Sequence, residues 1–505
     1  MAEVFYRRFC QAAIGQLLVA IPRTFLKNTL YLTSGSSFAT LLGIVSLPIV
    51  TRLFGPEAYG VFAMFSAMVA IVSVMACMRY ELSILLPDTD AEAATQCLLS
   101  ILFAALVSLM LFILIVAFGD WLIALLELHR IGPYLYLIPV YVLFHGLFLA
   151  ASGWKTRQKR FGQLAMVRVG NQSVTTFGSL SAGFSGATTA GALIWSLLAG
   201  KLVSTAVLVA QVWRASGRLI VSRFEVRTLT DGMLRYKKFP LLGSWSVLLS
   251  VSAWQLPVVL FGFFFSPMVA GLYALGFRIL QLPMNLIGNS IGQVFFQAAA
   301  EAEKQDSLDE LVVSLLDQVL KAILIPVLFL SVLGEDFYTI VFGKEWSQAG
   351  VYAQILCAWA FFWFLSAPFV SLFAVLERQG LQLGWNIVNA TVRLGVICLG
   401  GFLQDIIFTV TLLSLSGAII YGYKVLIILR LAQVKFARFW GLLRDRLTQC
   451  SIAFFAVLSI VWACDGAVVR LGFSAVILCV HFALIYREQL VDAKKYVEKR
   501  LASRH

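Results

Sequence analysis

Seven ionisable side chains fall inside stretches of this sequence that are otherwise apolar, and six of the seven are cationic. An ionisable group in such a stretch costs several kcal/mol unless it faces a cavity or has a partner. Arginine holds phosphate oxygens through two parallel N–H groups, whereas lysine acts as a point charge. The excess of cations therefore predicts a site for an anionic, phosphate-bearing group. The seven residues are Arg168, Lys201, Arg278, Asp317, Lys321, Arg393 and Lys424.

Arg278 is the first candidate for binding that group. It lies one turn inside its apolar stretch, and Pro283 follows it, which frees backbone groups close to the site. The alternative is that Arg278 pairs with a neighbouring helix. Arg393 and Arg168 are further candidates, and the alternative for both is that they snorkel to a membrane interface. Lys201 and Lys424 have the same alternative.

Two other sets of polar residues have helical spacing. Asn285, Asn289 and Gln293 repeat at i, i+4 and i+8. They either line a polar path for the hydroxyl groups of a ligand or hydrogen-bond a neighbouring helix. Asp317 and Lys321 are four residues apart, which predicts an ion pair on one helix face rather than a ligand contact.

The run Arg79-Tyr80-Glu81 ends an apolar stretch. Arg79 and Glu81 form either a helix-terminal charge pair or a gate. Coupling of an ion to Asp317 or Glu81 is an additional hypothesis, because a carboxyl group in an apolar stretch is often part of an ion path.

Motifs of catalysis are missing from the sequence. The eight cysteines show no CxxC spacing, and the four histidines show no HExxH motif or clustered ligand spacing. Gly200-Lys201 lacks both the Ser/Thr and the glycine spacing of a phosphate loop. We therefore expect no metal, no cofactor and no enzymatic activity.

Long apolar stretches recur along nearly the whole chain of 505 residues, of which 60% are hydrophobic and 13% charged. Soluble domains carry about a quarter charged residues, so this chain has too few charges to cover a surface in water. It is predicted to be an all-α membrane protein with about fourteen transmembrane helices. The predicted spans are 30–50, 60–86, 94–118, 132–152, 162–182, 189–213, 241–264, 268–297, 312–333, 349–375, 381–400, 404–430, 449–465 and 468–486.

Basic residues alternate with these spans. If the N-terminus is cytoplasmic, most lysines and arginines between spans fall on the cytoplasmic side, as the positive-inside rule requires. Both termini are then cytoplasmic. Nucleic-acid binding would need the charges on one folded face, and here they punctuate apolar spans, so no nucleic-acid partner is expected. The apolar segment from Phe9 to Pro22 is too short for a span and is either an interfacial helix or a disordered leader.

The chain also repeats itself. The run Phe54–Ala63 aligns with Phe265–Ala274, so that Phe, Pro, Gly and Ala coincide in the two copies. Six predicted spans separate the copies, which gives the two halves the same orientation, related by an axis along the membrane normal. We expect two six-helix lobes followed by two extra helices. The predicted segments are 1–29 (N-terminal, cytoplasmic or interfacial), 30–213 (first lobe), 214–240 (basic linker), 241–430 (second lobe), 431–448 (basic loop), 449–486 (last two helices) and 487–505 (basic tail).

Five further motifs stand out in the chain, namely TRLFGPEAYGVFAM, MRYELSILLP, FRILQLPMNLIGNSIGQVFF, VFGKEWSQAGVYAQIL and LERQGLQLGWN. Together they resemble the polysaccharide exporters, including the O-antigen (Wzx-like) flippases, of the multidrug/oligosaccharidyl-lipid/polysaccharide (MOP) superfamily. The resemblance extends over about residues 30 to 430. It implies the pseudo-two-fold arrangement of multidrug exporters and lipid II flippases. The pattern of Arg278 followed by Pro283 is also similar to that of the lipid II flippases. Those carry an acidic residue just before the arginine, where this chain has Phe277. This difference argues against a peptidoglycan precursor as the substrate.

The resemblance implies a flippase of the bacterial inner membrane. Its substrate would be a lipid-pyrophosphate-linked oligosaccharide, an O-antigen, capsule or exopolysaccharide unit, moved by alternating access. Membrane lipids would surround it, and polysaccharide polymerase and export proteins are further implied partners. Two alternatives stay open. A drug/cation antiporter of the same superfamily needs an acidic cavity, and a membrane glycan polymerase or ligase needs a large outer loop with catalytic residues.

Overall fold

All regular structure in the described part of the chain is helical. The computed structural model describes residues 23–125, 130–284, 289–464 and 466–485, and none of these residues lies in a strand. Ten of the described helices are long and apolar enough to cross a bilayer. The predicted all-α membrane fold is confirmed, while the number of fourteen spans stays a prediction. The predicted interfacial segment from Phe9 to Pro22 lies outside the described residues.

Contacts between residues divide the chain into two units. The first unit comprises the residues up to Phe54 and Met64–Gln255, and the second comprises Gly55–Ala63 and the residues from Leu256 onward. The helices of the first unit are α2 (Arg23–Ser73, apart from Gly55–Ala63), α3 (Tyr80–Ser83), α4 (Asp90–Leu125), α5 (Gly132–Leu135), α6 (Leu137–Arg157), α7 (Phe161–Phe184), α8 (Ala190–Val221), α9 (Val226–Arg235), the π-helix η1 (Phe239–Gly243) and the first half of α10 (Ser244–Phe264).

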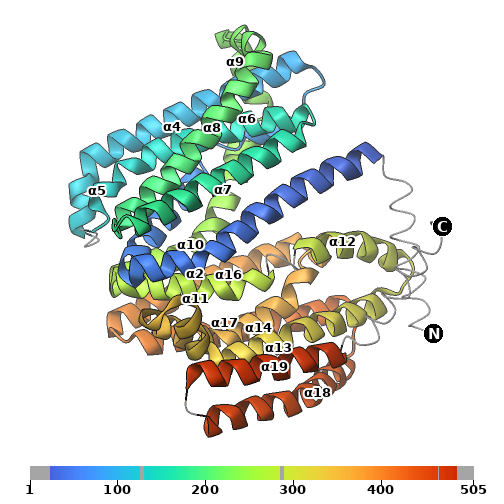
Figure 1. Ribbon diagram of the computed structural model, residues 1–505. Helices are drawn as coiled ribbons and strands as arrows, with labels where there is room; N and C mark the ends of the chain where they lie inside the picture. The colour runs from blue at the N-terminus through green and yellow to red at the C-terminus, as the bar shows by residue number, and fades with distance from the viewer. Residues whose placement is uncertain (1–22, 126–129, 285–288, 465, 486–505) are drawn as a thin grey trace, which may run out of the picture. The chain divides into compact units, whose positions relative to one another are not determined.

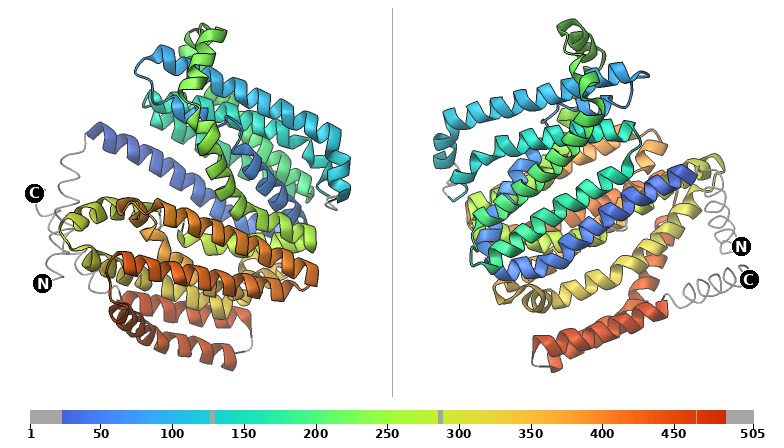
Figure 2. Two further views of the ribbon diagram at one scale, coloured as in Figure 1. Left: turned by 180° about the vertical axis from the view of Figure 1, so that it is seen from behind. Right: turned by 45° about the horizontal axis from the view of Figure 1, so that its top comes forward.

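The second unit begins, apart from the segment Gly55–Ala63, in the second half of α10. Its last two helices, α18 and α19, pack on each other and on α13 (Figure 2). Its further elements are α11 (Pro267–Pro283), α12 (Asn289–Lys304), α13 (Leu308–Phe342), η3 (Lys344–Trp346), α14 (Ser347–Ser366), η4 (Ala367–Phe369), α15 (Leu372–Val375), α16 (Gln379–Leu403), α17 (Ile406–Leu431), α18 (Phe436–Ala463) and α19 (Ala467–Ile485).

The same packing order occurs in both units. In the first unit α4 packs on α6, α6 on α8, and α8 on α7 (Figure 1). In the second unit α13 packs on α14, α14 on α17, and α17 on α16. The two units therefore share one order of helix packing.

Short polar residues fix where three of the long helices begin. Thr189, Ser266 and Asp405 precede α8, α11 and α17, and each side-chain oxygen accepts a hydrogen bond from a backbone N–H of the first helical turn. Such caps satisfy donors that have no partner within the helix. Pro267 follows Ser266 at the first position of α11, where its missing N–H carries no cost.

The first two predicted spans, 30–50 and 60–86, form one interrupted helix. Gly55, with φ 65°, breaks α2 in the middle, in a conformation that glycine adopts without the strain of a Cβ. The helix ends at Ser73, before the predicted end at 86. The backbone then passes through positive φ at Met78 and Arg79 before α3 begins.

Two other predicted spans differ from expectation. The stretch 268–297 is divided between α11, which ends at Pro283, and α12, which begins at Asn289. Pro283 has no backbone N–H to donate to the carbonyl four residues earlier, so it disfavours a continuous helix through this position. The predicted span 162–182 is helical as α7, but its polar content keeps it out of the ten candidate spans in the described chain.

Candidate functional site

Arg278 is positioned by a tyrosine that the sequence analysis did not single out. Arg278 lies on α11 with its side chain exposed, and its Nη1 donates a hydrogen bond to the hydroxyl of Tyr59 at 3.2 Å. Tyr59 is buried, and its ring meets the edge of the Trp346 ring at 5.4 Å between centroids. One donor group of the guanidinium is therefore held in place, and the exposed side chain presents further donors to a ligand.

The residue before Arg278 has a structural role. Phe277 is buried and stacks on the rings of Trp359 and Trp363 at 5.3 and 5.9 Å, and Tyr273 stacks on it at 5.8 Å. Trp359 and Trp363 therefore pack against Phe277 within this unit. An acidic side chain at this position would be buried among aromatic rings.

Arg393 lies in the interior of the second unit rather than at an interface. It is 3% exposed, its guanidinium lies 4.6 Å from the centre of the Trp359 ring, and it hydrogen-bonds the side chain of Tyr421. Asn389, one turn earlier on α16, also hydrogen-bonds Tyr421. The interpretation as a snorkelling residue is wrong for Arg393, because α16 turns it toward α14 and α17.

Lys201 and Lys424 are also buried instead of snorkelling. The Lys201 ammonium lies 4.4 Å from the centre of the Phe148 ring, and the Lys424 ammonium lies 4.0 Å from that of Trp385. Both side chains are nearly inaccessible. A cation over an aromatic face is stabilised by about 2 kcal/mol when desolvated. The aromatic partners thus offset part of the cost of burial.

Arg168 is exposed, like Arg278, and lies on the polar helix α7 of the first unit. Its Nη1 donates to Ser36 Oγ on α2 at 3.1 Å. Gln172, one turn along α7, donates to Thr176 at 3.1 Å. Arg168 is therefore a second exposed cation with a serine partner. The polar side chains after it, which the sequence analysis did not use, extend a hydrophilic strip along α7.

The predicted stripe of amides is only partly described. Asn285 lies outside the described residues, whereas Asn289 and Gln293 lie one turn apart on α12. The stripe does not run along one continuous helix, because α11 ends at Pro283.

The RYE run forms a compact turn in the first unit. Arg79 Nη1 lies 3.6 Å from a carboxylate oxygen of Glu81, which is 7% exposed. The hydroxyl of Tyr80 donates to the backbone carbonyl of Met233 on α9 at 3.1 Å. The predicted charge pair is present, and the tyrosine between its members ties α3 to α9.

The predicted pair of Asp317 and Lys321 is confirmed at 2.7 Å, with a further partner. Arg446 on α18 donates to the other oxygen of Asp317 at 2.6 Å. Two similar ion pairs join α13 to the last two helices, namely Asp309 with Arg438 and Asp336 with Arg470. Because both of its oxygens are engaged by cations, Asp317 is a structural anchor in this conformation.

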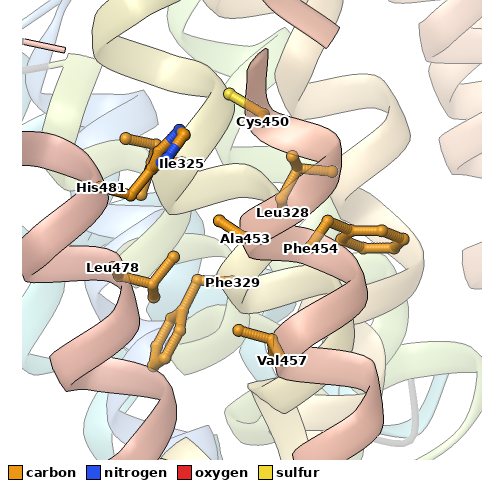
Figure 3. Close-up of a pocket in the computed structure, with 9 residues that line it drawn as sticks. All are labelled: Ile325, Leu328, Phe329, Cys450, Ala453, Phe454, Val457, Leu478 and His481. Carbon is orange, nitrogen blue, oxygen red and sulfur yellow. The ribbon is translucent and has the colours of Figure 1, made fainter. Parts of the chain in front are cut away.

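A small cavity lies near these ion pairs, between α13, α18 and α19 (Figure 3). It is lined by apolar side chains such as Phe329 and Leu478 together with His481 and Cys450, and its volume is about 10 Å³. That volume holds about one water molecule, so the cavity is a packing gap. Across the described residues there is no cluster of three or more metal-ligating side chains.

Comparison with protein families places the sequence. Residues 49–350 match the family model described as "Polysaccharide biosynthesis protein". The chain belongs to this polysaccharide biosynthesis family. The match covers more than half of the chain and contains Arg168, Arg278 and Tyr59. The search of curated proteins gives no match.

Several solved structures have a similar fold. The polysaccharide biosynthesis protein is similar to a lipid II flippase MurJ in an inward closed conformation, with a TM-score of 0.71, 14% identity and coverage of 91% of this chain and 99% of that one. It is also similar to an inward-facing MATE family multidrug transporter of the MOP superfamily. The TM-score is 0.61 and the identity 12%, with coverage of 78% of this chain and 96% of that one.

A MOP superfamily transporter from Pyrococcus furiosus is a third similar structure (TM-score 0.52, 12% identity, covering 81% of this chain and 95% of that one). The family model confirms the predicted resemblance to polysaccharide biosynthesis proteins, and the chain shares the fold of these solved structures. The ten long apolar helices of the described residues agree with a multi-pass membrane protein.

Proposed function

We propose that this polysaccharide biosynthesis protein is a flippase that moves lipid-pyrophosphate-linked oligosaccharides across the bacterial inner membrane by alternating access. The cargo is an O-antigen, capsule or exopolysaccharide unit. The observation that carries the proposal is the exposed guanidinium of Arg278, held by Tyr59 at 3.2 Å within a MOP-type fold.

Arg278 is suited to the pyrophosphate. A guanidinium has five N–H donors in a fixed fork, and it binds two oxygens of one phosphate at once. The bond to Tyr59 occupies part of Nη1 and fixes the plane of the group. Arg168, in the first unit, is the other exposed arginine among the candidates for binding phosphate. Asn285, Asn289 and Gln293 are proposed to bind sugar hydroxyls.

The membrane potential supplies part of the driving force. Moving one negative charge outward across an inside-negative membrane releases about 2.3 kcal/mol per 100 mV. A pyrophosphate-linked cargo carries negative charge outward, and the unloaded cationic carrier then returns.

Two other functions are less well supported. A drug/cation antiporter needs acidic groups for its cationic ligand, but the exposed ionisable candidates are Arg278 and Arg168, and Asp317 is engaged by Lys321 and Arg446. A glycan polymerase or ligase needs catalytic residues on a large loop. The run Phe54–Ala63 lies within α2, where Gly55 forms a kink and no loop interrupts the helix. Only Phe265 and Ser266 join α10 to α11.

The proposed orientation in the membrane is based on the basic segments. We propose the inner membrane with both termini cytoplasmic, because the lysines and arginines of 214–240, 431–448 and 487–505 then lie on the cytoplasmic side. Polysaccharide polymerase and export proteins are proposed partners.

The test is transbilayer movement of a lipid-pyrophosphate-linked sugar in vesicles that contain the purified protein. We expect Arg278→Ala to lower the rate by about tenfold to a hundredfold, as for loss of a charge-assisted hydrogen bond. Arg430→Ala, at the exposed end of α17, is the matched control. Transport that survives Arg278→Ala unchanged removes Arg278 from the path, and absence of transport in the wild type argues for the antiporter or the enzyme.

A further inference from the structure

The basic linker between α8 and α10 contains a helix that is fastened to the first unit by one face. Helix α9 packs on α4, where Gly232 faces Gln96 so closely that a Cβ would lie 2.8 Å from the Gln96 amide nitrogen. Arg235 pairs with Glu92 at 2.8 Å, at the beginning of α4. Together with the bond from Tyr80 to Met233, these contacts fix the position of α9 on the end of a membrane span.

An apolar groove lies beside this contact. It is lined by four residues of α4 and three of α9, and its volume is about 350 Å³, which is in the range of small-molecule sites. Leu102 and Leu106 are exposed on α4, a candidate membrane span, so this groove opens where acyl chains lie. The lining residues are Leu99, Leu102, Phe103, Leu106, Leu229, Thr230 and Met233.

The end of the groove at α9 is strongly cationic. Residues 214–238 contain seven arginines and lysines and two acidic residues, a net charge of +5 by difference. Arg227 precedes Thr230 by three residues on α9, so the two share one face of the helix. Lys237 lies in the turn that directly follows the end of α9 at Arg235. The side chains of Arg227 and Lys237 are both exposed.

Apolar side chains accompany the charges. Phe224, Val226 and Leu234 on or next to α9 are 65%, 73% and 58% exposed. A helix with exposed cations and exposed apolar side chains is typical of the membrane interface. Clusters of four to eight basic residues beside a membrane span attract anionic head groups.

From this juxtaposition we infer that the groove between α4 and α9 is a binding site for an anionic phospholipid of the surrounding bilayer. One acyl chain lies between Leu102, Leu106 and Met233, and the phosphate lies against Arg227 and Lys237. The site is distinct from Arg278, which belongs to the other unit. It recognises a lipid of the bilayer, whereas Arg278 is proposed to bind the transported lipid.

The test uses the full-length protein, equilibrated with vesicles of phosphatidylcholine and phosphatidylglycerol and then extracted. Native mass spectrometry counts the retained molecules of each lipid. We expect preferential retention of phosphatidylglycerol. That preference should decrease about fivefold for each cation removed, or roughly twenty-five-fold for Arg227→Gln with Lys237→Gln. Thr230→Trp fills the groove and should lower retention of both lipids.

The matched control removes two exposed cations elsewhere, Arg430→Gln with Lys435→Gln. An unchanged preference in the Arg227/Lys237 variant overturns the proposal, and so does an equal loss in the control, since that reflects net charge alone. Because these four side chains are exposed, the variants should fold as the wild type does. Transport measured in parallel separates this site from the proposed function: the lipid preference is expected whether or not the oligosaccharide is moved.

Discussion

Gly60 and Gly271 lie backbone to backbone where α2 passes α11, and each faces a proline of the other helix. A Cβ on Gly60 would collide with the carbonyl oxygen of Pro267, and a Cβ on Gly271 would collide with that of Pro56. The four residues occupy matching positions in the two copies of the repeated run, Phe54–Ala63 and Phe265–Ala274. The repeat therefore packs on itself, and each glycine is required for the other copy to approach.

This contact predicts a large effect of a small substitution. We expect Gly60→Ala and Gly271→Ala each to lower the free energy of unfolding by about 1–3 kcal/mol, because the added methyl meets backbone atoms that have no rotamer to change. Gly170→Ala on α7 is the control, since its Cβ would have open space. Thermal unfolding of the detergent-solubilised protein measures the difference. A Gly60 variant as stable as the Gly170 variant would contradict the close crossing.

The hydrogen bond between Arg278 and Tyr59 predicts that transport depends on the position of the guanidinium as well as on its charge. Arg278→Lys keeps the charge but loses the fork, and Tyr59→Phe keeps the charge and removes the partner. We expect both to lower the transport of a pyrophosphate-linked lipid, by about tenfold for Lys and about fivefold for Phe, which corresponds to about 1 kcal/mol for one hydrogen bond. Initial rates in vesicles give the comparison. Full activity in both variants would show that the geometry of the guanidinium is irrelevant.

The engagement of Asp317 predicts a structural defect rather than loss of ion dependence. Asp317→Asn should lower stability by about 1–3 kcal/mol, since Arg446 then lies partly buried without its carboxylate. Arg446→Gln should have a similar effect, and the double variant should be less destabilised than the sum of the two. Any dependence of transport on protons or sodium should be unchanged in Asp317→Asn. Loss of that dependence would restore Asp317 as a coupling residue.

Glu81 predicts a dependence of stability on pH. It lies outside the candidate spans, on α3, and burial raises the pKa of its carboxyl group, an effect that Arg79 only partly opposes. Because the folded pKa is raised, this contribution to stability is complete below the pKa of an unfolded glutamate and is lost as pH rises through the folded pKa. Glu81→Gln should therefore gain stability relative to the wild type as pH rises from about 4 to 8.

The exposed Glu303 on α12 provides the control substitution for that series. Unfolding temperatures of wild type, Glu81→Gln and Glu303→Gln across the pH range decide the matter. A Glu81→Gln variant that loses stability with rising pH would mean that the ion pair with Arg79 outweighs the cost of burial.

The sequence predicts local properties of this protein better than long-range ones. Apolar length predicts the helices, and spacing predicts the pair of Asp317 and Lys321, because both depend on neighbours along one helix. Arg446 is 129 residues from Asp317, and no local pattern connects them. The burial of Arg393 was likewise missed, because its partners Trp359 and Tyr421 come from two other helices. Tyr59 had a usable signal, since it lies within the repeated run.

The two partners of Asp317 also imply an order of events during synthesis. Helix α13 enters the membrane before α18 exists, and at typical elongation rates the 129 residues up to Arg446 take roughly ten seconds to make. Lys321, one turn away on the same helix, is present from the start and forms its pair with Asp317 within α13. We therefore expect Lys321 to neutralise the carboxylate while α18 is still being made, and Arg446 to join the pair afterwards.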